Sequence, residues 1–283
     1  MNDDAAVLKI GNETLVITHD MMAEGVHFLP DADPADVAWK LVAVNLSDLA
    51  AKGAEPIGVL LGFTLGDDAW DEAFARGLEA ALSHFDVALL GGDTVSGNEN
   101  GRILGLTALG RATPDEVPVR SGAKSGDALY VTGTIGDALA GYELITSQQT
   151  GPQSLLKAYN RPEPLISAGR SLAPVVTAMM DVSDGLLLDA SRMAQASGLA
   201  VEIDLAALPL SENYKTVRGD GRISKLAAAS WGDDYQLLYA ASPGAKLSVD
   251  ATKVGIFLDG NGITLHDRDE MIPLPEKLGF QHS

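Results

Sequence analysis

The sequence predicts a two-domain protein of the α/β or α+β class. Apolar segments of strand length alternate with amphipathic segments of helix length through both halves of the chain. With 283 residues, of which 46% are hydrophobic, the chain is long enough for two domains of ordinary size. Residues 113–126 are polar and contain two prolines and two glycines, so we place the boundary near residue 115. The expected domains are residues 1–115 and 116–283.

Local signals place the elements of the first half. Gly11-Asn12, between two short apolar segments, predicts a hairpin turn. Asp33 and Pro34 are typical of a helix start, and Gly53 is typical of a helix end. We expect the strand that leads into Gly91-Gly92-Asp93 to be short and buried. The expected strands cover residues 7–10, 14–18, 57–65, 87–90 and 103–112, and the helices cover residues 33–53 and 68–85.

The second half repeats the theme of a strand, a turn with glycine or aspartate, and a helix. Its helices are expected to begin at Gly136, after Pro164 and at Ser183. The expected strands cover residues 128–132, 175–181, 200–204, 235–241, 253–258 and 262–265.

The composition narrows the possible functions. A formal net charge of −19 repels phosphate backbones and anionic lipids, so we expect neither nucleic acid nor a membrane as a partner. The absence of cysteine excludes disulfides, thiolate nucleophiles and cysteine-ligated metal centres. No signal peptide and no membrane-spanning segment is evident, and we expect a cytoplasmic protein. An acidic protein can still bind an anionic nucleotide when metal cations lie between the two.

Aspartates are concentrated beside glycines at the expected turns. Magnesium prefers oxygen ligands and often binds through a few carboxylates together with substrate phosphates. A glycine next to an aspartate lets a phosphate approach the backbone. The pattern therefore indicates a metal and phosphate site, centred on Asp93, Asp181 and Asp184. The clusters are Asp3-Asp4, Thr18-His19-Asp20, Asn45 with Asp48, Gly91-Gly92-Asp93-Thr94, Asp181-Val182-Ser183-Asp184-Gly185 and Gly232-Asp233-Asp234.

Each feature also has an ordinary structural explanation. Asp3-Asp4 is compatible with a solvated terminus, and Asp184 has the position of a helix N-cap. Residues 133–137 follow a strand and form a candidate phosphate turn, although glycine-rich turns alone are weak evidence. Arg120 suits bidentate contact with phosphate or, equally, a surface ion pair. The sequence contains no P-loop, protein-kinase or nucleophile-elbow motif.

Taken together, these segments resemble the thiamine-monophosphate kinase family of the aminoimidazole-ribonucleotide-synthetase-like superfamily. The matching stretches span nearly the whole chain and follow the order found in the family. Their combination is far more specific than any single stretch. The matching stretches are residues 3–8, 20–28, 44–56, 90–94, 120–127, 131–137, 181–186 and 232–235.

The resemblance implies a synthetase-like fold, in which helices cover one face of an N-terminal sheet and an α/β sandwich follows. It implies magnesium-assisted transfer of the ATP γ-phosphoryl group to thiamine monophosphate, in a homodimer that pairs through its N-terminal sheets. The implied catalytic residues are Asp93, Asp181 and Asp184. The implied metal ligands are Asp4, Thr18, His19, Asp20, Asp48, Asp93, Asp181 and Asp184. The implied ATP contacts are Gly92, Arg120 and Ser183, and the implied thiamine contacts are His27, Asp233 and Phe280.

The chain departs from the family pattern at a few positions. His19 stands where threonine is usual, Trp231 replaces a glycine and Gln236 replaces an acidic residue. Members of the family also carry a segment before the Asp3-Asp4 pair. Two other functions therefore stay open: another ATP-using synthetase of the superfamily, and a nucleotide- and metal-binding protein without turnover. Relatives that act through a cysteine are disfavoured, because the chain has none.

Overall fold

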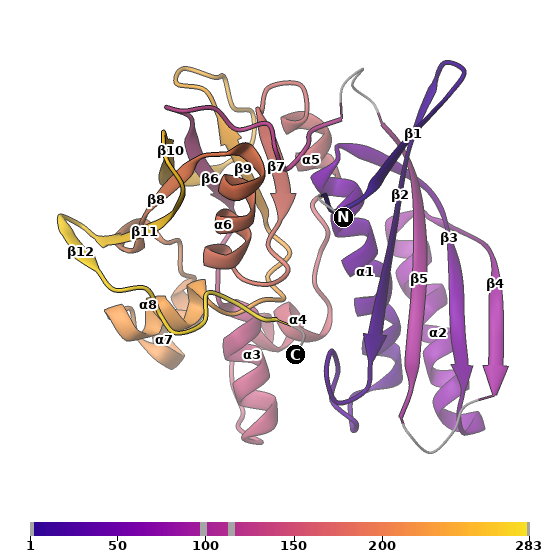
Figure 1. Ribbon diagram of the computed structural model, residues 1–283. Coiled ribbons are helices and arrows are strands. Elements are labelled where there is room, and N and C mark those ends of the chain that lie inside the picture. Colours follow the sequence, from indigo (N-terminus) through magenta and orange to yellow (C-terminus); the bar gives the residue numbers. More distant parts are fainter. Residues whose placement is uncertain (1–2, 97–100, 113–116, 282–283) are drawn as a thin grey trace.

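Two β-sheets, one from each half of the chain, organise the protein (Figure 1). The computed structural model describes residues 3–96, 101–112 and 117–281. The first half contains β1 (Ala6–Ile10), β2 (Glu13–Ala23), α1 (Pro34–Ala51), β3 (Ala54–Leu65), α2 (Asp68–Phe85), β4 (Ala88–Ser96) and β5 (Ile103–Ala112). Its strands form one sheet in the order β1-β2-β5-β3-β4.

Short-range signals fix most of this sheet and its helices. β1 and β2 pair antiparallel, with Ile10 opposite Glu13 across the predicted turn at Gly11-Asn12. β2 is longer than expected because its pairing with β5 continues to Ala23, beyond Ile17, where its pairing with β1 ends. Asp33 caps α1 as predicted, since its side chain accepts a hydrogen bond from the Ala35 N–H at 2.9 Å.

One expectation about this sheet is wrong. The strand expected at residues 87–90 is neither short nor buried: β4 runs through Gly91-Gly92-Asp93 and is exposed along its length. β4 lies at the edge of the sheet, parallel to β3. The helices α1 and α2 pack on one face of the sheet and leave its other face open (Figure 1). An apolar run therefore indicates a strand, but it does not show whether a second layer covers that strand.

The second half contains a seven-stranded sheet in the order β12-β11-β8-β10-β6-β9-β7. Its strands are β6 (Ala128–Thr132), β7 (Ala178–Asp181), β8 (Ala200–Asp204), β9 (Leu237–Ala241), β10 (Ala251–Leu258), β11 (Gly262–Asp267) and β12 (Glu270–Ile272). Its helices are α3 (Asp137–Thr146), α4 (Gln153–Asn160), α5 (Ile166–Leu172), α6 (Leu186–Ser197), α7 (Glu212–Arg218) and α8 (Arg222–Ala229), with a 3₁₀ turn at Leu205–Ala207. The sequence patterns did not reveal α4, α7, α8 or β12.

The helix that follows the Asp181 segment begins later than expected. Residue Gly185 has a φ of 117°, a conformation that favours glycine, and α6 starts at Leu186 rather than Ser183. Asp184 is therefore not the N-cap that its spacing suggested. The strand before it is also shorter, because β7 begins at Ala178 rather than at residue 175.

The two domains share a buried layer between their sheets. On β9, Leu238 and Ala240 pack into the C-terminal core, whereas Leu237 and Tyr239 on the other face pack against the end of α1 and against α5. This alternation follows from the two-residue period of a strand. Figure 1 shows α1 between the N-terminal sheet and β7. The predicted fold class is thus confirmed, with α1 as the element common to both domains.

The predicted boundary near residue 115 falls on residues 113–116, which lie outside the described part of the chain. The division into residues 1–115 and 116–283 therefore stays a prediction. Within residues 3–96, 101–112 and 117–281, no helix is both long and apolar enough to cross a membrane.

The contact of α5 with α1 generates a prediction about stability. A Cβ atom at Gly169 would lie 1.9 Å from the backbone oxygen of Ala50, so Gly169→Ala must push the two helices apart. We expect a loss of about 1–3 kcal/mol in the free energy of unfolding, measured by urea denaturation. The control is Ser167→Ala in the exposed part of the same helix, which should be nearly neutral. Equal stability of both variants would contradict this packing.

Candidate active site

The helix α1 carries an unusual set of buried polar side chains. Lys40, Asn45, Ser47 and Asp48 are all buried within it, and Lys52 is buried at its C-terminal cap. Burying such groups is costly unless each one has a partner. Their partners come from β2, from β7 and from the segments around residues 4 and 233, so the helix gathers residues that are far apart in the sequence.

Three aspartates from different elements meet around α1. The hydroxyl of Thr18 on β2 donates to Asp48, and the hydroxyl of Ser47 donates to Asp181 on β7 at 2.5 Å. The backbone N–H of Asp20 donates to the side-chain oxygen of Asn45 at 2.9 Å. The structure therefore brings together four residues that the family resemblance implies as metal ligands, namely Thr18, Asp20, Asp48 and Asp181.

Burial and mutual repulsion act on these carboxyl groups. Burial, followed by the negative charges of Asp181, Asp20 and Asp4, raises the pKa of Asp48 well above its ordinary value. Burial and the charge of Asp4 do the same to the pKa of Asp181. Burial also raises the pKa of Asp20, against an opposing effect of His19. Among the described residues, no lysine or arginine pairs with these three carboxyl groups, and a bound cation would relieve the repulsion.

Asp4 differs from this group because two cations neutralise it. Its carboxylate pairs with Lys52 at 2.9 Å and with Arg120. Burial alone would raise the pKa of Asp4, but these two positive charges lower it. Lys52 also pairs with Asp3. The explanation of Asp3-Asp4 as a merely solvated terminus is therefore wrong for Asp4, which is buried and tied to α1.

A second carboxyl pair lies at the start of α6. Asp189 accepts the backbone N–H groups of Asp184 and Gly185, each at 3.1 Å, and Arg192 pairs with Asp189 at 3.0 Å and with Asp184. Burial and then the charge of Asp184 raise the pKa of Asp189 to about 7. Sequence reasoning missed Asp189, although a charged residue directly after Leu186-Leu187-Leu188 was an available signal.

His19 and Asp93 lie apart from the cluster. His19 extends from the opposite face of β2 from Thr18, and its Nδ1 lies 2.9 Å from the hydroxyl of Thr107. Asp93 is on β4, with β3 and β5 between it and β2. At the usual spacing of strands, β4 is about 14 Å from β2. Within one chain, neither side chain joins Asp20 and Asp48.

The residues predicted to contact thiamine are adjacent to one another. Lys40 pairs with Asp233 at 2.8 Å and also donates to the backbone oxygen of His27 at 3.3 Å. The rings of His27 and Phe280 are 6.4 Å apart, edge to face. The backbone N–H of Phe280 donates to the carbonyl oxygen of Asp184 at 2.9 Å. This group therefore adjoins the Asp184 segment.

The predicted ATP contacts are in two places. Arg120 lies beside Asp4, and its buried Nε has no hydrogen-bond partner among the described residues. The carbonyl oxygen of Ser183 accepts the N–H of Asp233 at 2.9 Å. Gly92 is on β4, where a Cβ would lie 2.0 Å from the backbone oxygen of Leu61, so only glycine fits. Gly92 and Asp93 thus share a strand away from Arg120 and Ser183.

The candidate phosphate turn at residues 133–137 is already occupied. The N–H of Gly136 donates to both carboxylate oxygens of Asp234, at 2.9 and 3.0 Å, and the N–H of Ile135 donates to Pro209. Burial raises the pKa of Asp234 well above its ordinary value. Two of the N–H groups that a bound phosphate would need are therefore already paired with acceptors of the protein. The hypothesis of a phosphate-binding turn is wrong for residues 133–137.

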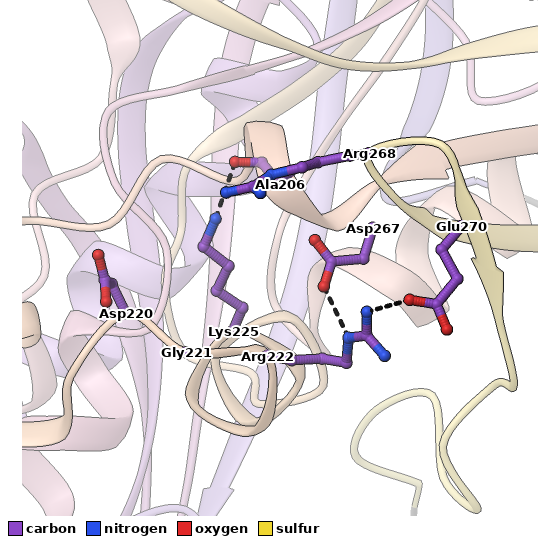
Figure 2. Close-up of a pocket in the computed structure, with 8 residues that line it drawn as sticks. All are labelled: Ala206, Asp220, Gly221, Arg222, Lys225, Asp267, Arg268 and Glu270. Carbon is purple, nitrogen blue, oxygen red and sulfur yellow. Dashed lines mark hydrogen bonds and ion pairs between the residues drawn. The ribbon is translucent and has the colours of Figure 1, made fainter.

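A cavity of about 440 Å³ lies elsewhere in the C-terminal domain. Figure 2 shows its Arg222 between Asp267 and Glu270, at 2.6 and 2.5 Å, and its Lys225 donating to the backbone of Ala206 at 2.8 Å. None of the predicted site residues lines it. The cavity is therefore separate from the cluster around α1.

The donor set suits magnesium, although no site is preformed. Across the part of the chain that the structure describes, no three Asp, Glu or His side chains are arranged to hold a metal ion. The oxygens of Asp20, Asp48 and Asp181 are nevertheless the hard ligands that magnesium prefers. Asp4 is held instead by Lys52 and Arg120. Metal binding by these residues stays a prediction.

The chain matches known families along most of its length. Residues 2–112 match "AIR synthase related protein, N-terminal domain", and residues 124–253 match the corresponding C-terminal domain. A thiamine-monophosphate kinase from Salmonella typhimurium is 42% identical, over 84% of this chain and 75% of that protein. One from Caulobacter vibrioides is 40% identical, over 99% of this chain and 84% of that protein.

Solved structures agree with these relatives. A structure described as "AaThiL complexed with AMPPCP and TMP" superposes with a TM-score of 0.89 at 30% identity, covering 99% of this chain and 91% of that one. A thiamine-monophosphate kinase from Stenotrophomonas maltophilia gives a TM-score of 0.81 at 34% identity, covering 93% and 91%. A hydrogenase maturation protein, HypE, at 17% identity and a TM-score of 0.75, shares the fold alone.

The raised pKa values generate a prediction about pH and stability. A carboxyl group whose pKa is raised by folding destabilises the folded state as the pH rises from its ordinary pKa, about 4, through the raised value. Asn cannot ionise, so Asp48→Asn should stabilise the magnesium-free protein at pH 8 by more than about 1 kcal/mol. The gain should shrink toward zero as the pH falls to 4. Thermal or urea unfolding at both pH values, with EDTA present, provides the measurement.

The control is Asp259→Asn, an exposed turn residue that should show no such dependence. A gain from Asp48→Asn that is as large at pH 4 as at pH 8 would show that repulsion between ionised carboxylates is not its cause.

Proposed function

Because the chain belongs to the thiamine-monophosphate kinase family of AIR synthase related proteins, we propose that it transfers the γ-phosphoryl group of ATP to the phosphate of thiamine monophosphate. The products are thiamine diphosphate and ADP. The observation that carries this proposal is the meeting of Asp20, Asp48 and Asp181 from three elements, next to Asp4 and Arg120. Such a site needs cations, and it offers a guanidinium for phosphate.

In the proposed reaction, the bond from the γ-phosphorus to the β–γ bridging oxygen breaks, and a bond forms to an oxygen of the acceptor phosphate. No covalent enzyme intermediate is required, so the protein contributes position and charge. Magnesium, when bound, would neutralise phosphate and carboxylate oxygens, with Asp20, Asp48 and Asp181 as its holders. Thr18 and Ser47 orient two of these carboxylates by hydrogen bonds.

Arg120 lies at one end of the proposed site, and the residues proposed to contact thiamine lie at the other end. The buried Nε of Arg120 has no partner in the described chain and is suited to a phosphate oxygen. His27, Asp233 and Phe280 lie together at the other end, next to the Asp184 segment. ATP as co-substrate makes the cytoplasm the natural compartment, and a cytoplasmic location is part of this proposal.

The test is a direct assay of purified protein with ATP, magnesium and thiamine monophosphate, in which ADP and thiamine diphosphate are both measured. Equal amounts of the two products support the kinase. ATP binding without either product would favour the alternative of a nucleotide-binding protein without turnover. ADP formation without thiamine diphosphate would favour another synthetase of the superfamily.

Removal of one buried carboxylate should abolish most of the activity. We expect Asp181→Asn to lower kcat by about 100-fold or more, because one of the three carboxylates proposed to hold magnesium is lost. The amide retains the shape of the side chain, so circular dichroism should show a folded protein. Asp259→Asn should have normal kcat. A near-normal rate for Asp181→Asn at limiting magnesium would contradict the assignment of Asp181 to metal binding.

We also propose a homodimer, formed through the open face of the N-terminal sheet. Met21, Leu60, Leu90, Val95 and Ile103 lie on or around this face, and each is between 40% and 54% exposed. An apolar surface of this kind on a sheet is typical of an interface. The sheet also has free edges, since β4 has no outer neighbour and β2 has none beyond Ile17 among the described strands.

The position of Asp93 supports this assembly. Met21 pairs with Gly105, Gly105 with Gly62, and Gly62 with Asp93, so all four positions share the open face. Asp93 and Gly92 are remote from Asp20 within one chain. In this proposal a second copy brings its β4 edge toward the free edge of β2, and the predicted role of Asp93 depends on that copy.

A charge on the open face should prevent this association. We expect the wild type to be a dimer by light scattering and Leu90→Glu to be a monomer, because the interface would bury the new carboxylate. Leu274→Glu, at an exposed leucine of the C-terminal domain, is the matched control and should leave the dimer intact. A monomeric wild type, or a Leu90→Glu variant that still dimerises, would exclude this interface.

A further inference from the structure

The ammonium group of Lys40 connects both domains at the thiamine end of the proposed site. Lys40 lies on α1 and is only 3% exposed. Its Nζ is 2.8 Å from Asp233, 3.3 Å from the backbone oxygen of His27 and 4.1 Å from the centre of the Tyr159 ring. A buried lysine needs such partners, and here they are two hydrogen-bond acceptors and the face of an aromatic ring.

Both oxygens of the Asp233 carboxylate are held in place. Lys40 binds Oδ2, and the hydroxyl of Tyr235 donates to Oδ1 at 3.0 Å. The backbone of Asp233 has a φ of 65°, which is unusual for a residue other than glycine. Its N–H donates to Ser183 at 2.9 Å. The orientation of this carboxylate is therefore set by its neighbours, of which Lys40 supplies a positive charge.

Lys40 is distant from the carboxylate cluster on the same helix. Asp48 follows it by eight positions, which corresponds to about 12 Å along a helix axis. Among the described residues, Lys40 contacts Asp233, the His27 backbone and the Tyr159 ring, and it forms no hydrogen bond or ion pair with the carboxylates of the cluster. A change at Lys40 should therefore affect one end of the site and leave the other end in place.

We propose that Lys40 is a positioning residue for the acceptor substrate: it fixes the Asp233 carboxylate and the His27 backbone in the arrangement that receives thiamine monophosphate. This inference rests on the proposed function, in which Asp233 and His27 contact the thiamine group. Thiamine carries a positively charged ring, and the Asp233 carboxylate lies among the residues proposed to contact it. Lys40 holds one oxygen of that carboxylate and Tyr235 holds the other, so its orientation at the acceptor end of the site is fixed.

The experiment compares the wild type with Lys40→Met and Lys40→Arg in the full chain. KM for thiamine monophosphate is measured at saturating ATP, and KM for ATP at saturating acceptor. We expect Lys40→Met to raise the first by about 10-fold or more and the second by less than about 2-fold, since it removes binding at one end of the site. Lys40→Arg keeps the charge beside Asp233 and should recover most of the affinity for the acceptor.

The matched control is Lys157→Met, at an exposed lysine of α4 that pairs with Glu163. It should change neither KM. If Lys40→Met does not fold, as judged by circular dichroism, Lys40→Gln takes its place, because its amide can still donate to Asp233. It should raise KM for the acceptor alone by about 3-fold or more.

The outcomes separate the two levels of inference. Failure of the wild type to form thiamine diphosphate would overturn the proposed function and this inference with it. Turnover by the wild type with an unchanged KM for thiamine monophosphate in Lys40→Met would overturn the role of Lys40 alone. A parallel rise in both KM values would do the same, because it would indicate a general loss of structure rather than positioning of the acceptor.

Discussion

The burial of α1 between two sheets is the constraint on which the rest of the structure depends. One side of this helix faces β2 and β5, and the other faces β7 and α5. A helix in that position would normally be apolar all round, yet α1 buries Lys40, Asn45, Ser47 and Asp48. Each must be paired, and their partners come from both halves of the chain. Folding and assembly of the site are thus the same event.

The same constraint leaves the site electrostatically unbalanced. Asp48 and Asp181 are buried near other carboxyl groups, and their pKa values are raised. Asp4, by contrast, pairs with two cations, Lys52 and Arg120. A core chosen for stability alone would not contain such a cluster. The imbalance is instead what the proposed binding of cations and phosphates requires, at a cost to the stability of the protein without them.

The sequence predicted features that local chemistry decides. The Asp33 cap, the Gly11-Asn12 turn and the strands at residues 128–132 and 200–204 all follow from signals within a few residues. Features that depend on distant partners were missed or misjudged. The N–H of Gly136 is paired with Asp234, which is almost a hundred residues away in the sequence. β4 is exposed, because burial of a strand requires a second layer that its own sequence does not specify. The grouping of Asp20, Asp48 and Asp181 could be predicted only through family resemblance.

The contacts of α1 also constrain how its length can vary. Inserting or deleting one residue shifts the following part of a helix by about 1.5 Å and rotates it by about 100°. Between Lys40 and Asp48, such a change would turn the Asp48 cluster away from β2 and β7 while Lys40 stayed with Asp233. The loops of a protein usually accept changes in length. We therefore expect no insertion or deletion to be accepted between Lys40 and Asp48, so the spacing of these residues is as much a part of the site as their identity.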